Sequence, residues 1–301
     1  MDESWKTHKG VFATLSVPPV VWLFAFFLIP LAIIWAYSFG YNKSLTEIAI
    51  DGTLANYAHA VRPLYLGIIF KSLWFAALTT ALCLVVGFPV AIAITFASEK
   101  TKAWLLLLIM LPFWTNLLIR TYALMAVLRT EGYINYALGF LWSGLSHATA
   151  LAGHPLGAFH PLPLLHNNFA VVFGLVYVQL PFMVLPLYAA LDRLDRSLLE
   201  ASLDLGAGHF TTFARVVVPL AIPGIVSGVL VTLIPSIGAY LTPDLLGGPD
   251  SQMIANVIER QFRSADDWPF GAALSFLLMY MTFVAIALQA VVSRRRGGEA
   301  A

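Results

Sequence analysis

Long apolar runs, separated by polar gaps, dominate the sequence. A helix needs roughly 20 mostly apolar residues to cross a bilayer, and six segments satisfy this requirement, at about 17–39, 71–97, 103–128, 169–191, 216–240 and 271–292. Open sheet edges cannot face lipid, and a β-barrel would show shorter alternating segments. The pattern therefore predicts an all-α membrane protein with six transmembrane helices.

The composition supports lipid as the solvent of these runs. Of the 301 residues, 59% are hydrophobic and only 11% are charged, whereas a soluble domain is closer to half apolar and a quarter charged. The net charge of +1 does not indicate nucleic acid as a partner. Cys83 is the single cysteine, which excludes an intramolecular disulfide and argues against a thiolate metal cluster.

The distribution of Lys and Arg predicts how the helices are oriented. Ten of the seventeen basic residues fall in the two terminal segments and in two short gaps, namely Lys6, Lys9, Lys100, Lys102, Arg193, Arg196, Arg215, Arg294, Arg295 and Arg296. These segments are predicted to be cytoplasmic. The organisation is then a cytoplasmic tail at 1–16, a membrane domain at 17–293 with a cytoplasmic loop near 193–216 and an outer loop near 129–168, and a basic cytoplasmic tail at 294–301.

The first apolar run is predicted to be a retained anchor. Basic residues precede it, as in a secretion signal, but the run is longer than the apolar core of a signal. No small-x-small cleavage site follows it either. We therefore count it as the first transmembrane helix.

The outer loop carries four histidines, at positions 147, 154, 160 and 166. Histidines could hold a metal ion, but these spacings fit no compact helix or finger pattern. Proline and glycine also interrupt the later part of the loop. An irregular loop is the preferred interpretation, and no metal site is predicted.

Several catalytic signatures are absent from the sequence. It contains no G-x-x-x-x-G-K-[ST] phosphate loop, no G-x-S-x-G and no H-E-x-x-H. The spans also lack the paired acids that proton relays use. Arg120 is the one deep charge, and two interpretations stay open: it snorkels to the interface or it lines a water-filled path. These observations argue against an enzyme and against a self-contained proton-driven pump.

Proline and glycine punctuate the predicted helices. Each proline removes a helix hydrogen bond and can kink a span, as expected at Pro112, Pro181, Pro186, Pro219, Pro223 and Pro235. Such breaks are tolerated where neighbours or a water-lined cavity satisfy the freed carbonyls. Gly224 and Gly228 form a G-x-x-x-G pair, which allows another helix to approach closely.

A short polar helix is predicted between the fourth and fifth spans. Ser197 and Glu200 have the S-x-x-E spacing of a capping box, and Gly206 or Gly208 suits a left-handed stop at the other end. Leu199 and Leu203 share one face of the helix. Because so short a helix is marginal in water, it either docks into a groove on a partner or packs on its own bundle.

This segment resembles the EAA loop of ABC-importer permeases. The matching residues are Glu200, Ala201 and Ser202, then Gly206, then Pro219, with Ser202 in place of the usual second alanine. The resemblance extends to "LPFWTNLLIRTYALMAVLRTEGYIN" (111–135), "GLVYVQLPFMVLPLYAALDRLD" (174–195) and "PSIGAYLTPDLLGG" (235–248), which look like the spermidine/putrescine permeases of the PotB type.

The resemblance implies a MetI-like type I permease bundle in the bacterial cytoplasmic membrane. In such importers two permease subunits line one path, two ATPase subunits lie below them and a solute-binding protein docks outside. ATP is then used by the partner ATPase, and this chain needs no cofactor. The second permease is expected to be a sister chain. The residues implied in ATPase coupling are Ser197, Leu199, Glu200, Ala201, Leu203, Asp204, Leu205, Gly206 and Ala207.

The solute path is expected to suit a flexible polycation, which aromatic faces and acids would bind. The candidates are Trp114, Tyr122, Tyr177, Gln179, Tyr240 and Asp244. Aromatic residues are also common at membrane interfaces for structural reasons. Alternative functions are a permease for another small solute, such as a phosphonate or another cation, a stand-alone secondary transporter, or a membrane scaffold that transports nothing.

Overall fold

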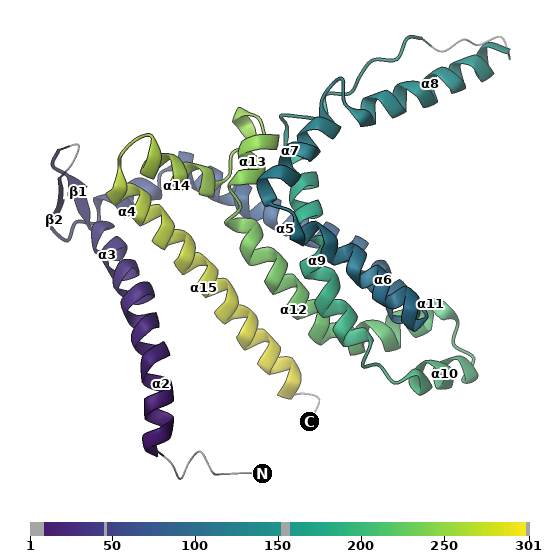
Figure 1. Cartoon of the computed structure of the whole chain (residues 1–301), viewed down its shortest axis with the longest axis horizontal. Helices are drawn as coiled ribbons and strands as arrows, with labels where there is room; N and C mark the ends of the chain where they lie inside the picture. The colour runs from purple at the N-terminus through teal and green to yellow at the C-terminus, as the bar shows by residue number, and fades with distance from the viewer. Residues whose placement is uncertain (1–8, 45–46, 152–156, 299–301) are drawn as a thin grey trace. The chain divides into compact units, whose positions relative to one another are not determined.

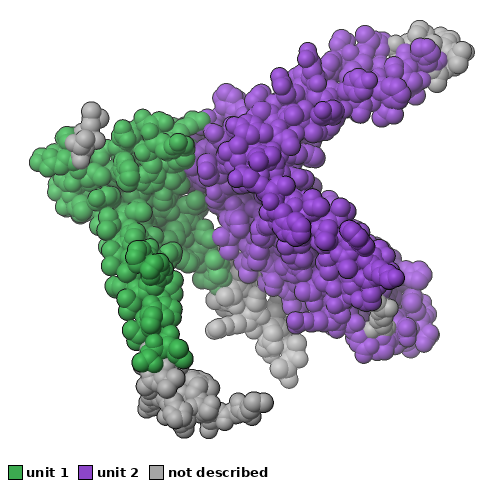
Figure 2. Space-filling view, viewed as in Figure 1, with its two compact units in different colours: residues 1–66, 257–301 green, residues 67–256 purple. Residues whose placement is uncertain are grey.

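The computed structural model describes residues 9–44, 47–151 and 157–298, and these residues are mostly helical (Figure 1). They form two compact units, which Figure 2 distinguishes by colour. The first unit combines residues 1–66 with 257–301, and the second holds residues 67–256.

The first unit joins apolar helices to a short hairpin. Its elements are α2 (Lys9–Leu23), η1 (Phe24–Leu28), α3 (Ile29–Tyr37), β1 (Gly40–Asn42), β2 (Ile48–Ile50), α4 (Ala55–Ala60) and α15 (Trp268–Gly298), with α14 (Ile254–Arg263) contributing its later part. The strands pair antiparallel with Tyr41 opposite Ala49. Trp35 donates from Nε1 to the Tyr280 hydroxyl at 2.8 Å, and His59 stacks on Phe270. These contacts fasten α3 and α4 to α15.

The second unit is a helical bundle that carries two excursions. Its elements are α5 (Pro63–Thr95), α6 (Glu99–Met110), η2 (Leu111–Trp114), α7 (Leu117–Leu128), α8 (Tyr133–Leu151), α9 (Asn168–Leu191), α10 (Arg196–Asp204), α11 (His209–Thr212), η3 (Phe213–Val217), α12 (Val218–Ile237), α13 (Leu241–Leu246) and η4 (Pro249–Ser251). The main core lies between α5, α9 and the start of α12, and it includes Cys83, Ile94, Met183 and Leu187. The buried Cys83 is therefore an apolar filler.

Four helices of the described chain are long and apolar enough to cross a membrane. They are Thr14–Tyr37, Pro63–Thr95, Asn168–Leu191 and His209–Ile237. A fifth candidate is the pair Glu99–Trp114 and Leu117–His147, which is bent by 99°. The last predicted span lies in α15, whose apolar part is shorter, at Trp268–Val284. The described residues therefore do not confirm the predicted count of six spans.

The span expected at 103–128 is broken after η2, close to the kink expected at Pro112. Pro112 cannot donate a helix hydrogen bond, and Thr115 and Asn116 adopt extended backbone conformations. Asn116 then caps α7, since its Oδ1 accepts from the Leu118 amide at 2.8 Å. A strong cap directly after a proline turn therefore restarts the helix in a new direction.

The segment expected to be an outer loop at 129–168 is also more ordered than its sequence suggests, because it contains α8. The chain returns along α8 in an extended conformation, and Asn135 bonds the return segment twice, to the carbonyl and the amide of Leu162, both at 2.9 Å. Trp142 donates to the Gly157 carbonyl at 2.9 Å. Helix α8 contains no Asp, Glu, Lys or Arg. Its composition therefore does not distinguish it from the apolar segments on either side.

The predicted tails are helical where the structure describes them. Residue Lys9 begins α2, so this helix starts within the expected tail at 1–16. At the other end, α15 continues to Gly298 and includes most of the expected tail at 294–301. Helix formation therefore continues beyond the apolar runs at both ends of the chain.

The close packing of α9 against α12 confirms the G-x-x-x-G interpretation (Figure 1). A Cβ atom added at Gly224 would lie 2.5 Å from Ala190 Cβ and 2.8 Å from the Pro186 carbonyl oxygen. One added at Gly228 would lie 2.7 Å from Met183 Sδ. Only a glycine lets the two backbones approach this closely at Gly224.

We expect Gly224→Ala to destabilise the protein by about 1–3 kcal/mol, because a methyl group has no room beside the α9 backbone. Thermal unfolding in detergent would measure the change. Gly144→Ala is the matched control, since Gly144 also lies in a helix but a methyl group added there would meet nothing within 4 Å. An unchanged melting temperature for Gly224→Ala would contradict the packing described above.

Candidate functional site

The short polar helix α10 begins at Arg196, two residues earlier than a cap at Ser197 predicts, and Asp195 caps it. The Asp195 Oδ1 atom accepts from the Ser197 amide at 2.9 Å. This hydrogen bond lowers the pKa of the Asp195 carboxyl, which keeps it ionised. The predicted capping box of Ser197 and Glu200 is therefore wrong: Ser197 lies inside the helix, and Glu200 is exposed on its second turn. A carboxylate is the better cap because it also complements the helix dipole.

The end of α10 confirms the predicted stop at Gly206. This residue has φ +83°, and its amide donates to the Leu203 carbonyl at 2.9 Å. The next amide, of Ala207, donates to the Ser202 carbonyl at 3.1 Å. The two bonds form a Schellman motif, which requires the left-handed conformation that glycine adopts without strain. Gly208 is extended and has no such requirement.

Contacts on one face hold α10 against its own bundle. Leu199 packs on the main core, and the Ser202 hydroxyl lies 2.9 Å from that of the buried Thr212. Leu199 is half-buried and contributes to the core, and its expected contact with a partner's groove stays a prediction. A cavity of about 550 Å³ adjoins this face, lined by Ile92, Phe96, Leu199, Glu200, Leu203, His209, Thr212, Phe213 and Val217.

The other face of α10 is open. Leu205 is 89% exposed, and Leu203, although it lies on the same side of the helix as Leu199, is still 40% exposed. Ala201 and the two acids Glu200 and Asp204 are exposed as well, while Ala207 is half-buried. The helix thus presents an apolar end beside two carboxylates, on a backbone that its own caps and the Thr212 contact hold in place.

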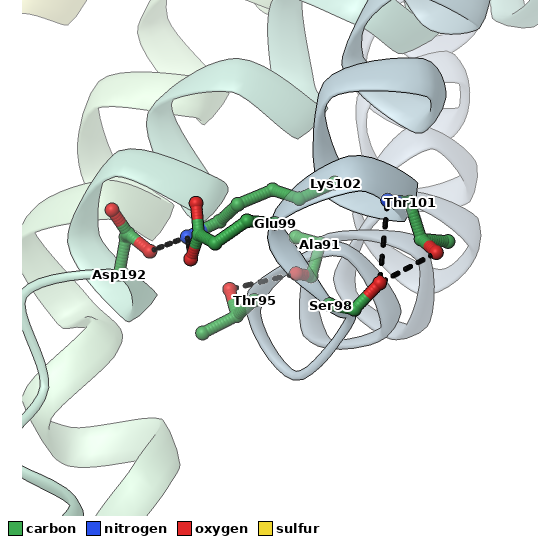
Figure 3. Close-up of polar contacts among 7 residues, drawn as sticks. All are labelled: Ala91, Thr95, Ser98, Glu99, Thr101, Lys102 and Asp192. Carbon is green, nitrogen blue, oxygen red and sulfur yellow. Dashed lines mark hydrogen bonds and ion pairs between the residues drawn. The ribbon is translucent and has the colours of Figure 1, made fainter.

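A polar cluster lies where α9 leads toward α10 (Figure 3). Lys102 Nζ lies 2.6 Å from Asp192 Oδ1, and Asp192 is the C-terminal cap residue of α9. Ser98 caps α6, accepting from the Thr101 amide at 3.4 Å. The cluster therefore fastens the start of α6 to the end of α9.

A second candidate region is a cavity of about 370 Å³ between η2, α7, α9 and α13. Its lining consists of Phe113, Leu117, Arg120, Leu175, Val178, Gln179, Phe182, Pro235, Gly238, Ala239, Tyr240, Leu241 and Thr242. Gln179 is 4% exposed, and its Oε1 has no hydrogen-bond partner. Arg120 Nε is buried and also unpartnered. A buried acceptor and a buried donor therefore line one cavity, and its lining residues include no carboxylate.

The structure favours the path-lining interpretation of Arg120 over snorkelling. Its Nη1 donates to the Pro112 carbonyl at 3.2 Å, and its guanidinium lies over the rings of Phe113 and Tyr177, at 6.0 and 5.8 Å from their centroids. Arg120 thus satisfies a carbonyl that the broken span frees. Arg120 is not among the six candidates for the solute path named above, although a water-filled path is one of its two interpretations.

The predicted path residues do not all come together. Gln179 and Tyr240 line the cavity, and Tyr177 contacts Arg120 beside it. Trp114 is 79% exposed and Tyr122 is 50% exposed, and neither lines the cavity. Asp244 is exposed on α13 and is not a lining residue either.

Among the described residues, no group of three or more His, Cys, Asp or Glu side chains could hold a metal ion. His166 lies near the Gly247 carbonyl, at 3.4 Å, and His147 is in α8. His154 lies outside the described residues.

We expect Asp195→Ala to loosen α10, because the Ser197 amide loses its acceptor, at a cost of about 1 kcal/mol. Hydrogen exchange of the Ser197 amide should accelerate, as measured by mass spectrometry of the peptide that contains it. Glu200→Ala is the control and should leave this exchange unchanged. An equal effect of both substitutions would restore the capping-box interpretation.

Comparison with known proteins places this geometry in a family. The model of the "binding-protein-dependent transport system inner membrane component" family matches residues 9–298. The chain is 41% identical to the spermidine/putrescine transport system permease protein PotB of Salmonella typhimurium (strain SL1344) over 278 residues, which is 92% of this chain and 91% of that protein. It is 40% identical to PotB of Escherichia coli (strain K12) over 264 residues, 88% and 91% of the two chains.

A solved structure has the same fold. A chain of a bacterial ABC transporter involved in the import of the acidic polysaccharide alginate superposes with a TM-score of 0.68, covering 97% of each chain at 15% identity. This likeness concerns the fold alone. Together with the family match along nearly the whole chain, it leads to one assignment: the protein belongs to the binding-protein-dependent transport system inner membrane components, the permease subunits of ABC importers.

Proposed function

We propose that this chain forms half of the translocation path of an ATP-driven importer for a polyamine such as spermidine or putrescine. A solute-binding protein delivers the polyamine from outside, and α10 docks on a cytoplasmic ATPase subunit. The observation that carries the proposal is the architecture of α10: capped at both ends, packed on one face and exposed on the other. The chain itself contains no phosphate loop, so ATP hydrolysis belongs to a partner.

The exposed end of α10 suits an apolar groove on the ATPase. Leu205 is almost fully exposed, and Leu203 is partly so. A helix that offers such side chains to a groove is a common recognition mode. Because the caps fix the helix independently of any partner, the docking surface is preorganised, which lowers the entropy cost of association.

The polyamine assignment is supported by the identity to the PotB proteins and by the cavity. The buried Gln179 Oε1 can accept from an ammonium group, and the aromatic rings that line the cavity suit a cation. A neutral acceptor binds an ammonium more weakly than a carboxylate would. Weak binding suits a path, because the solute must leave it again.

The proposal places both termini and α10 in the cytoplasm, following the distribution of basic residues. Two ATPase subunits then lie below the membrane, and a second permease, a sister chain, completes the path. Coupling through α10 is a two-state mechanism, in which closure of the ATPase dimer shifts the bundle between inward-open and outward-open states.

A second candidate is a permease for a small anion such as a phosphonate. Arg120 favours it, because a buried guanidinium with an unpartnered Nε is a donor for anionic oxygens. Measuring the affinity of the cognate solute-binding protein for polyamines and for phosphonates distinguishes the two candidates. The solute that the binding protein retains is the one that it delivers to the permease.

We expect Gly206→Val to weaken both ATPase association and uptake, by about tenfold, because a left-handed β-branched residue costs about 1–2 kcal/mol. Co-purification with the ATPase and uptake of labelled spermidine measure the two effects. Gly208→Val is the matched control, since Gly208 has an extended conformation that any residue adopts. Normal association together with normal uptake in Gly206→Val would contradict the docking role.

We expect Gln179→Leu to reduce spermidine uptake by about tenfold, because the loss of a hydrogen bond to a charged group is worth about 1.5–3 kcal/mol. Uptake into proteoliposomes measures this. Asp244→Asn should transport like the parent, since Asp244 lies outside the cavity. If Gln179→Leu transported normally, the cavity would not be part of the polyamine path.

A further inference from the structure

One ion pair connects the segment that leads into α10 with the broken span. Lys102 Nζ lies 2.6 Å from Asp192 Oδ1, and Figure 3 shows the two side chains reaching toward each other from different helices. The residues are 90 positions apart in sequence. By contrast, the pairs Lys43–Glu47, Glu99–Lys102 and Glu259–Arg263 join side chains only three or four positions apart. We call the Lys102–Asp192 contact the α6–α9 ion pair.

The surroundings of Lys102 fix its position more tightly than a surface pair would. Its side chain is only 15% exposed, and its ammonium lies 5.4 Å from the centroid of the Tyr188 ring. Glu99 Oε1 is a further anion at 4.0 Å. The ammonium is therefore held by two carboxylates and one aromatic face, which defines the axial register of α6 against α9.

On one side, the α6–α9 ion pair is connected rigidly to α10. Asp192 ends α9, and the cap residue of α10, Asp195, follows three positions later. The turn between them is tight, since the Leu194 amide donates to the Leu191 carbonyl at 3.1 Å, and Leu194 packs against the main core. So short a connection has little slack, and a displacement of α10 along the membrane normal must also displace Asp192.

On the other side, the ion pair is connected to the cavity. Lys102 lies near the start of α6, and α6 leads through η2 into the break and then into α7. The α7 helix carries Arg120, which lines the cavity together with Gln179. The apolar side chains of α6 that face the core, Leu105, Leu106 and Ile109, can slide along it. The ion pair is directional and resists such sliding.

We propose that Lys102 and Asp192 are positioning residues that transmit the movement of α10 to the broken span, and thereby to the cavity. This role rests on the proposed function. Without the ion pair, the ATPase can still move α10 and the end of α9. Helices α6 and α7 then no longer move together with α9. ATP is then hydrolysed without a matching movement of solute.

The test uses the complete importer, with its ATPase, second permease and solute-binding protein, in proteoliposomes. Lys102→Met, Asp192→Asn and the double variant are compared for ATP hydrolysis and for uptake of labelled spermidine. We expect each single variant to take up about tenfold less spermidine per ATP, which corresponds to about 1.4 kcal/mol of coupling. The double variant should be no worse than either single variant, because both substitutions break the same interaction.

The matched control is the Glu259–Arg263 pair, which joins a half-buried glutamate to a well-exposed arginine within α14 at 3.0 Å. Glu259→Gln and Arg263→Met should leave uptake per ATP unchanged. Because Asp192 is 40% exposed, water can solvate its side chain when Lys102 is replaced, and all variants are expected to assemble.

Three results would overturn the inference: unchanged uptake per ATP in the single variants, losses that multiply in the double variant, or hydrolysis and uptake that fall together with the amount of assembled importer. The last result would give the pair a purely structural role. A parent importer that moves no polyamine with ATP would instead refute the proposed function, which distinguishes the two failures.

Discussion

The second unit depends on the close approach of α9 and α12. Gly224 and Gly228 remove the side chains that would separate the two helices, and the α9 backbone occupies the space. Without water to solvate them, helices in lipid associate through such close van der Waals contact. The packing has a consequence beyond stability. The end of α9 leads to Asp195, the cap of α10, and the segment before α12 supplies Thr212, its lateral contact. The short helix therefore stays in place because its two neighbours are fixed to each other.

The broken span is the second determinant of the site. A straight helix through 103–128 would carry Arg120 past the bundle as an isolated charge in lipid, which is costly. The break after η2 turns α7, so that the guanidinium reaches the Pro112 carbonyl and two aromatic rings. Irregular backbone at membrane depth is tolerated where it is buried or lines a cavity, and this break does line one.

The fold does not define the solute. The chain of the alginate transporter has the same architecture at 15% identity, and that transporter is involved in the import of an acidic polysaccharide. A fold shared by such different importers therefore does not identify the solute. In this chain the described cavity offers one unpartnered acceptor, on Gln179, and one unpartnered donor, on Arg120. These two groups are where the polyamine and the phosphonate hypotheses differ.

Much of the fold could be predicted because its causes are local. The length of the apolar runs predicts most of the spans, and the glycines at 224 and 228 predict a close helix contact. Gly206 predicts a helix end, because only glycine adopts its φ of +83° without strain. Other features had to await the tertiary structure. The sequence offers two acceptors for the start of α10, and the path of the chain after α9 selects Asp195 over Ser197. An apolar residue at position 199 suits both a contact with a partner and a contact with the bundle. Only the packing shows that Leu199 contacts the core. Arg120, Gln179 and Tyr240 are far apart in the sequence, and they share a cavity because α7, α9 and α13 meet there, a contact that no local pattern encodes.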